Sequence, residues 1–298
     1  MFLTVSNQGS QIRLDRYLRI IYPTISQGFI EKNLRSKEIK VNNLKVKSSD
    51  RVTCGDIIYI NDRLHAGIAD VKQKILNPAA IGLGKKLLTE YLLFEHEEFF
   101  AINKPQGVAV QGGTNIKYSL DDCFDYLETI GHDLRLVHRI DKDTSGLLLI
   151  ARNRNAAIKL TEAFKQRIIQ KCYLAVVNGD LKSKSGVIKS NIEDKEAETS
   201  YEVVNSIGRK HLVKFFPSSG RTHQIRIHTL DIGAYICGDS KYGNQQDLTE
   251  KKLMLHSWSV KLPESLFGKD IIITAPTTSS FKLYGFIEPA MNPSFEFK

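Results

Sequence analysis

Hydrophobic positions in the first 60 residues predict a small unit of two helices and short strands. Leu14, Leu18 and Ile21 are spaced three and four residues apart, which is the pattern of one apolar helix face. A second helix is expected from Ser26, whose hydroxyl can cap free backbone N–H groups, to about Arg35. Short strands are expected after it, at residues 39–41, 45–47 and 57–60.

The pattern changes twice further along the chain. Residues 61 to about 90 lose their periodicity and contain Asn77-Pro78, two glycines and the pair Lys85-Lys86, which is typical of a basic linker. From Tyr91 onward, apolar runs typical of strands alternate with a few helices, the clearest at residues 121–129 and 155–170. We therefore expect a front unit at residues 1–62, a linker at 63–90, a large domain at 91–287 and a tail at 288–298.

A polar cluster separates two apolar runs in the middle of the large domain. Residues 134–137 and 147–150 both suit buried strands, so the segment between them must form a loop. Catalytic groups are often placed on loops that a rigid scaffold holds. The acid at the centre of this loop is Asp141, and a single Asp beside a glycine-containing turn is more often only a turn residue. Its neighbours are needed to decide its role.

Composition and length predict a globular chain of two units. Hydrophobic residues make up 42% of the 298 residues and charged residues 25%, an ordinary globular balance. Single cores stop growing near ~250 to 300 residues, which favours two units. The first 90 residues hold 15 Lys and Arg against 8 Asp and Glu, so they carry +7 of the net charge of +9. This distribution favours a front end that binds nucleic acid, although basic surface residues can also serve solubility alone.

The sequence predicts a protein that stays in the cytoplasm. No run approaches the roughly 18 apolar residues of a membrane span, and the first residues lack the pattern of a secretory signal. We expect reduced cysteines and no metal site, because there is no C-x-x-C pair and no cluster at zinc spacing. The four cysteines are Cys54, Cys123, Cys172 and Cys237.

The loop around Asp141 resembles a family motif. Residues 138–146 read HRIDKDTSG, which closely resembles the HRLDxxTSG motif of the RluA family of pseudouridine synthases, with Ile140 in place of Leu. The resemblance extends from Tyr91 to about Ser259. Further blocks stand in family order: INKPQG at 102–107, KCYLAVVNG at 171–179, GRTHQIRIH at 220–228, GDSKYG at 238–243 and LMLHSW at 253–258.

The resemblance implies a reaction and roles for three residues. In the family, uracil is detached from ribose C1′, rotated and rejoined through its C5, with no cofactor or metal. Asp141 would be the nucleophile, either attacking the sugar or removing a ribose proton so that a glycal forms. Arg221 matches the arginine that pairs with this carboxylate, and Tyr173 matches the tyrosine that lies against the uracil ring.

The same resemblance implies roles for the rest of the loop. Arg139 matches the arginine thought to fill the gap that the flipped nucleotide leaves, so it is expected to contact RNA. His138 is grouped with it as an RNA-binding residue, and is expected to shape the loop by hydrogen bonds rather than to act as a general base. Thr144, Ser145 and Gly146 are expected to shape the turn that positions the nucleophile, with Gly146 free to adopt a positive φ.

The front unit resembles an S4 (αL-type) RNA-binding domain, in the segments RLDRYL, IKVNNLKVK and GDIIYI. One departure is Ser26-Gln27-Gly28, because the second helix of that family usually opens with Ser-Arg. One phosphate contact is therefore expected to be missing. The expected RNA contacts are the basic residues of the two helices: Arg13, Arg16, Arg19, Lys32 and Arg35.

Together the resemblances imply a mixed α/β (α+β) pseudouridine synthase fold on a long, mostly antiparallel mixed sheet. With an S4 domain in front, the closest match is the branch typified by RluC and RluD, which modifies uridines in large-subunit ribosomal RNA. We expect an isomerase that acts on this RNA as a monomer, with no membrane or metal partner. Two departures, Ala234-Tyr235 in place of His-Pro and Lys252 in place of Arg, are expected to affect target choice rather than activity.

Other interpretations of the same residues are weaker, and one stays open. Asp141 to Thr144 also matches the DxDxT pattern of haloacid-dehalogenase-like phosphatases, but no convincing acidic pair for magnesium follows it. His223 and His228 stand five residues apart in a segment that is expected to be a strand, which does not match a helical zinc motif. The open alternative is an assembly factor that binds precursor ribosomal RNA without catalysis.

Overall fold

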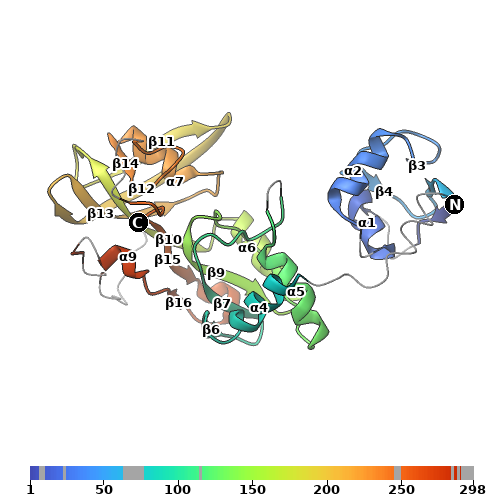
Figure 1. The fold of residues 1–298 in the computed structure, drawn as a ribbon, viewed down its shortest axis with the longest axis horizontal. Helices are drawn as coiled ribbons and strands as arrows, with labels where there is room; N and C mark the ends of the chain where they lie inside the picture. The colour runs from blue at the N-terminus through green and yellow to red at the C-terminus, as the bar shows by residue number, and fades with distance from the viewer. Residues whose placement is uncertain are drawn as a thin grey trace. The chain divides into compact units, whose positions relative to one another are not determined.

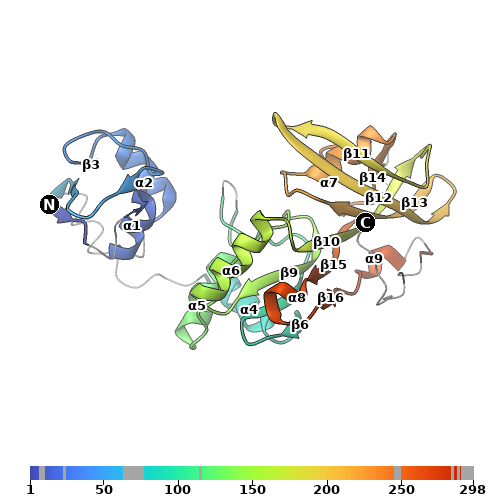
Figure 2. The same ribbon diagram turned by 180° about the vertical axis from the view of Figure 1, so that it is seen from behind.

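The computed structural model of the chain has two compact units, Met1–Ile75 and Leu76–Lys298, each with its own core (Figures 1 and 2). The described residues are 1–6, 11–22, 25–62, 77–113, 116–244, 250–282, 285–286 and 289. Half of the predicted linker, at 63–76, and nearly all of the predicted tail at 288–298 lie outside them.

The smaller unit contains the two predicted helices and several short strands. The Ser26 hydroxyl accepts a hydrogen bond of 3.1 Å from the Phe29 N–H, as expected of a helix cap. Residues 45–47, which were expected to form a strand, have no regular structure. The helices are α1 (Leu14–Ile21) and α2 (Gln27–Arg35). The strands β1 (Phe2–Thr4), β5 (Ile57–Ile60) and β3 (Ile39–Val41) form one sheet, and β2 (Ile12–Arg13) pairs with β4 (Arg51–Val52).

The buried face of α1 contains two of its three predicted positions. Leu14 and Leu18 are fully buried, but Ile21, the last residue of the helix, is 41% exposed. Tyr17 is buried instead, because it continues the same face one turn earlier. The basic side chains expected to contact RNA are exposed: Arg13, Arg16, Arg19, Lys32 and Arg35.

An 11-stranded mixed sheet forms the framework of the larger unit (Figure 1). β15 and β9 run parallel, whereas the other pairs of described strands in it run antiparallel, as expected. The main order is β11 (Ser185–Ile192), β12 (Lys195–Ile207), β13 (Lys210–Pro217), β10 (Gln170–Gly179), β15 (Leu255–Leu262), β9 (Ser145–Ala151), β7 (Phe99–Lys104) and β6 (Leu92–Glu95). β14 (Ala234–Ile236) pairs with β10, β16 (Ile271–Thr274) with β15, and β8 (Arg135–Leu136) with β9.

Helices cover both faces of the sheet at β9. Leu147 and Leu149 belong to the core that contains α6 (Arg154–Lys165), which lies along β9 in Figure 2. Leu148 and Ile150 belong to the core formed with α4 (Pro78–Leu87) and α5 (Leu120–Thr129), because alternate side chains of a strand point to opposite faces. All seven residues of β9 are buried, so the loop that precedes it is anchored to a rigid strand. Two short helices follow, α8 (Glu264–Phe267) and α9 (Ser279–Lys282).

One predicted linker segment is a helix. Residues 78–87 form α4, and the Asn77 side chain caps it by accepting from the Ala79 N–H at 2.9 Å. Ala80, Leu83 and Leu87 are buried at helical spacing, and a Cβ at Gly84 would lie 2.9 Å from the ring of Tyr126 on α5. The helix was not predicted because its glycines lower the helix propensity of the segment, although Gly84 allows the two helices to approach closely.

The segment 220–228 contains a helix and is not the expected strand. α7 (Gln224–Asp231) begins after His223, which adopts a left-handed conformation with φ of 56°. Its buried positions include Gln224, Arg226, His228 and Thr229, so the sequence has no apolar stripe from which this helix could be predicted. α6 also differs from its predicted range, since it ends at Lys165 and residue 167 has a positive φ of 61°.

A search of the described helices found none long and apolar enough to cross a membrane.

Candidate active site

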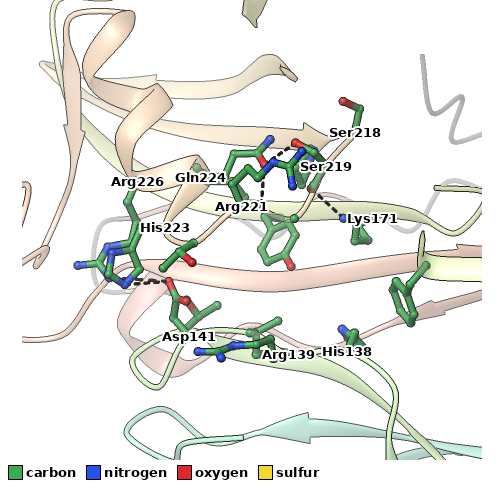
Figure 3. A pocket seen from close by; sticks show the side chains of 18 of the residues that line it. His138, Arg139, Asp141, Lys171, Ser218, Ser219, Arg221, His223, Gln224 and Arg226 are labelled. Carbon is green, nitrogen blue, oxygen red and sulfur yellow. Dashed lines mark hydrogen bonds and ion pairs between the residues drawn. The ribbon is translucent and has the colours of Figure 1, made fainter. Parts of the chain in front are cut away.

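A cavity of about 510 Å³ lies where the loop before β9 meets β10 and the start of α7 (Figure 3). A smaller cavity of about 260 Å³, lined by described residues, includes Gln106, Asp143 and Arg226. The loop 138–144 forms one wall of the larger cavity and the segment 217–226 forms another. Asp141, Tyr173, Arg221, Arg139 and His138, all predicted as site residues, line it.

The backbone around Asp141 is held from behind by the segment 104–107. The Lys142 carbonyl accepts from the Gly107 N–H at 2.9 Å and from Lys104 Nζ at 3.1 Å. The Lys104 side chain is fully buried, and its burial lowers the pKa of its amine to about 7 although Asp143 and Asp141 oppose the shift. These contacts leave the Asp141 side chain facing the cavity.

Gln106 ties the same loop to the start of β15. Its side-chain amide donates to the Asp143 carbonyl at 2.7 Å and to the Leu253 carbonyl at 2.8 Å. A single side chain therefore fixes the end of the loop against a segment 110 positions or more away in sequence. The sequence contained this residue in the INKPQG block, but its side-chain partners could not be inferred there.

The turn after Asp141 packs closely against β15. The Ser145 hydroxyl lies 2.8 Å from His256 Nδ1, and His256 Nε2 lies 3.2 Å from the Ala275 carbonyl. Since a carbonyl can only accept, Nε2 carries the proton and Ser145 donates to Nδ1. Gly146 has a φ of 107°, and a Cβ there would stand 2.3 Å from the Ser257 carbonyl oxygen. No other residue type fits this position without displacing β15.

Two basic side chains lie near the Asp141 carboxylate (Figure 3). Arg226 Nη1 is 3.7 Å and His223 Nε2 is 3.8 Å from Asp141 Oδ2. Arg226 is itself fixed, because its Nε and Nη2 each donate to Asp239 at 2.7 Å. Burial acts to raise the pKa of Asp239, but these bonds and the backbone N–H groups of Lys241 and Tyr242 outweigh it and lower the pKa.

His223 is oriented by a tyrosine. Its Nδ1 lies 3.0 Å from the Tyr242 hydroxyl, while its Nε2 faces Asp141. Burial lowers the pKa of His223, and the charge of Arg226 acts in the same direction against that of Asp141. The imidazole of His223 is therefore harder to protonate than that of an exposed histidine, even though Asp141 lies nearby.

The expected pairing of Arg221 with Asp141 is wrong in this structure. The Arg221 Nε donates to the Glu196 carbonyl at 3.3 Å, and the cation that faces Asp141 is Arg226. The physical reason is α7: it turns Arg226, in its first turn, toward the loop, whereas Arg221 precedes the helix. A strand would have placed residues 221 and 226 on opposite faces.

Tyr173 lies on β10 and contacts two of the cores as well as the cavity. Burial raises the pKa of its hydroxyl to about 12, although a hydrogen bond with Ser257 acts in the opposite direction. The phenol is therefore neutral across the physiological range.

His138 is held within the protein. Its Nε2 accepts the backbone N–H of Leu149 at 2.8 Å, and its ring stacks on Phe164 with centroids 4.3 Å apart. Burial lowers its pKa to about 3, with a further contribution from Lys171. A neutral imidazole that already accepts a backbone proton suits a hydrogen bonder that shapes the loop, and leaves Nε2 unavailable to RNA. Arg139, next to it, is exposed on the cavity wall.

Comparison with known proteins identifies the family. The family model described as RNA pseudouridylate synthase matches residues 98–231. A protein of Rickettsia bellii named ribosomal large subunit pseudouridine synthase C is 42% identical over 299 residues, which span 94% of this chain and 99% of the relative. This chain belongs to the RluA family of pseudouridine synthases. A Pasteurella multocida protein of the same name is 30% identical and is covered over 91% of its length.

Solved structures show the fold of this pseudouridine synthase. Human RNA pseudouridylate synthase domain containing 4 superposes with a TM-score of 0.59 at 23% identity, over 69% of this chain and 95% of that one. Human RNA pseudouridylate synthase domain containing 1 superposes with a TM-score of 0.54 at 22% identity, over 65% of this chain and 86% of that one. The expected pseudouridine synthase fold is confirmed.

The synthase shows no metal-binding cluster in the part of the chain that the structure describes, where groups of three or more His, Cys, Asp or Glu were sought. His223 faces Asp141, whereas His228 is fully buried with its Nδ1 2.9 Å from the Thr199 hydroxyl. The two histidines thus have separate surroundings on and before α7.

Sequence reasoning missed three residues around Asp141: Arg226, Asp239 and His223 in its present position. All three stand in blocks that had already been matched, GRTHQIRIH and GDSKYG. A buried charged residue needs a partner, so an Arg and an Asp in two neighbouring matched blocks could have suggested their pairing. Their geometry depended on α7, which the apolar pattern did not reveal.

Proposed function

We propose that this pseudouridine synthase converts uridines of large-subunit ribosomal RNA to pseudouridine, with Asp141 as the nucleophile. The observation that carries this proposal is the Asp141 side chain, which faces a cavity of about 510 Å³ from a rigid loop while Arg226 stands 3.7 Å from its carboxylate. The choice of RNA is supported by relatives named ribosomal large subunit pseudouridine synthase C, which match over 94% of this chain.

The chemistry starts with cleavage of the bond between uracil N1 and ribose C1′. Asp141 either attacks C1′ or removes a ribose proton, and its place on a fixed loop suits both routes. Arg226 orients the carboxylate, because its own direction is set by Asp239 through two hydrogen bonds of 2.7 Å. Uracil then turns and rejoins C1′ through C5, the C5 proton passes to water, and N1 gains a proton.

Other cavity residues would contact the flipped nucleotide. Removing a uridine from its stack costs a few kcal/mol, and the exposed Arg139 is placed where its guanidinium can stack on the neighbouring bases. Tyr173 offers a neutral aromatic ring for the uracil. Arg221, on the wall of the same cavity, is proposed to contact the RNA rather than Asp141.

The smaller unit would supply affinity. We propose that it acts as an S4-type RNA-binding domain through the exposed basic side chains of α1 and α2, since cations that meet phosphates release condensed counterions. We also propose that the enzyme works as a monomer in the cytoplasm, where its ribosomal RNA substrate is made.

The experiment is to map pseudouridines in large-subunit ribosomal RNA from cells with and without this protein. The proposal predicts that one or a few positions lose the modification and regain it when the wild-type gene is returned. If all positions stay modified and only the maturation of the RNA suffers, the protein is a non-catalytic assembly factor.

A further inference from the structure

Lys171 is an amine in the cavity with no role in the chemistry described above. It stands on β10 two residues before Tyr173, and both side chains line the same cavity. Its side chain is partly buried, and its Nζ donates to the Ser219 carbonyl at 3.1 Å. In Figure 3 it lies on the side of the pocket away from His223 and Arg226, which face Asp141.

The electrostatic surroundings of Lys171 are unusual. No carboxylate within the described ranges forms an ion pair with it. Burial lowers the pKa of its ammonium to about 8, and the charge of Arg167 lowers it further. Burying an ammonium without a counter-charge costs free energy. If the only role of Lys171 were to donate a hydrogen bond to the Ser219 carbonyl, a neutral donor could do so at a lower cost.

The two sides of the cavity match the two halves of a uridine. Asp141 must reach the sugar, so the ribose is expected on the Asp141 side. The base then extends along Tyr173 toward Lys171, where its carbonyl oxygens need hydrogen-bond donors. Lys165 and Arg167 also line the cavity, but both are exposed, whereas Lys171 is partly buried.

We propose that Lys171 is a catalytic residue that donates a hydrogen bond from its ammonium to a uracil carbonyl oxygen and stabilises the uracil anion. This rests on the proposed function. When the N1–C1′ bond breaks, its electron pair stays on uracil and is shared among N1, C5 and the two carbonyl oxygens. C5 then attacks C1′, the C5 proton passes to water, and N1 takes up a proton from water, so that the ring is neutral in the product. Lys171 transfers no proton.

The proposal predicts a pH dependence. Besides Lys171, the charged or titratable side chains that line the cavity are His138, Arg139, Asp141, Lys165, Arg167, Tyr173, Arg221, His223 and Arg226. The pKa of His138 lies near 3, that of Tyr173 near 12 and that of His223 below its usual value. The buried Lys104 behind the loop has a pKa lowered to about 7 and also titrates near this range, so a loss of activity as pH rises through about 8 is assigned to Lys171 by its disappearance in Lys171→Arg.

The test measures tritium release from a large-subunit ribosomal RNA transcript labelled at uracil C5. Lys171→Met keeps the length of the side chain without its charge, and should lower kcat by about 100-fold or more with little change in KM. Lys171→Arg keeps a permanent charge, and should remove the fall in kcat above pH 8. The matched control is Lys182→Met, which removes the charge of an exposed lysine of the same unit that does not line the cavity, and it should stay near wild-type activity.

Stability separates a catalytic role from a structural one. The single Trp258 is buried in β15 and reports unfolding of the larger unit by its fluorescence. Lys171→Met should leave the midpoint unchanged or higher, because it removes a poorly solvated charge. A kcat within threefold of wild type, an unchanged alkaline limb in Lys171→Arg, or a kcat loss that only follows lost stability would each overturn the proposal.

A second readout does not depend on turnover. At pH 8 the Lys171 amine should react with an acylating reagent, and bound transcript should protect Lys171 but not the exposed Lys182, which lies outside the cavity lining, as measured by peptide mass spectrometry. Equal labelling of Lys171 with and without RNA would overturn the proposal. If wild type binds the transcript and shows this protection but releases no tritium, the substrate assignment fails while the contact of Lys171 stands.

Discussion

Arg226 and Asp239 form a buried pair in which Nε and Nη2 of the guanidinium each donate to the carboxylate at 2.7 Å. The remaining nitrogen, Nη1, lies 3.7 Å from Asp141. A second acid thus fixes the arginine that faces Asp141. The orientation of Asp141 therefore depends on Arg226 and Asp239, which lie in two other segments, and a lysine cannot reproduce the bidentate geometry.

The two arginines of the segment 220–228 should differ in their effect on catalysis. Arg226→Lys keeps a positive charge but loses the two parallel hydrogen bonds to Asp239, and we expect kcat to fall about 100-fold. Arg221→Lys should change kcat less than about 10-fold and act mainly on KM, since Arg221 does not face Asp141. Tritium release at saturating RNA measures both. A larger kcat loss for Arg221→Lys would restore the original assignment of this arginine.

Two glycines of positive φ should respond differently to alanine. A Cβ at Gly146 would stand 2.3 Å from the Ser257 carbonyl, whereas at Gly107 nothing lies within 4 Å. Gly107→Ala should cost about 1–2 kcal/mol of unfolding free energy through backbone strain. Gly146→Ala should cost at least about 3 kcal/mol more, or prevent folding. Urea denaturation followed by Trp258 fluorescence measures the difference, and equal losses would contradict the close contact with β15.

His138 should make the larger unit sensitive to acid. Its folded pKa of about 3 lies below the unfolded value of 6.5, so its contribution is complete above pH 6.5 and is lost as pH falls toward 3. Between pH 7 and 5 this loss amounts to about 2 kcal/mol at most. His138→Gln can still accept the Leu149 N–H but does not titrate, so its stability should fall less over this interval. The free energy of unfolding is measured by Trp258 fluorescence. Equal losses of stability in wild type and His138→Gln between pH 7 and 5 would refute the role of His138 in the acid sensitivity.

The basic surface of the smaller unit should determine how salt affects RNA binding. Replacing Arg16, Lys32 and Arg35 by Gln in the full chain should weaken binding and reduce the slope of log K against log salt by about 2. Lys182, Lys184 and Lys195 are exposed on the other unit and serve as a matched control triple, whose change to Gln should leave the slope nearly unaltered. If the variant with Gln at positions 16, 32 and 35 keeps the wild-type slope of log K against log salt, the smaller unit does not bind RNA through these side chains.

The sequence predicted the parts of the site that depend on apolar burial. Residues 147–150 had to be a buried strand, so the polar run before them had to be a loop, and the structure has both. Ser26 was recognised as a helix cap because its hydroxyl follows a local rule. Such local features follow from the order of residues alone.

The sequence did not predict the parts that depend on buried polar partners. α7 buries Gln224, Arg226, His228 and Thr229, which are satisfied by groups on other elements such as Asp239 and Thr199. An apolar pattern cannot reveal such a helix. Arg221 was assigned from the family resemblance, which carried no geometry that could separate it from Arg226. α4 was missed for a different reason, since its glycines allow packing on α5 but lower helix propensity.

The central claim is that Asp141 carries out the isomerisation. The direct test is tritium release from large-subunit ribosomal RNA labelled at uracil C5, with wild type and Asp141→Asn compared at equal RNA binding. Asn keeps the shape of the side chain but is not an effective nucleophile or base. We predict release by wild type and essentially none by Asp141→Asn. Equal release by the two proteins would contradict the assignment of Asp141 as the nucleophile.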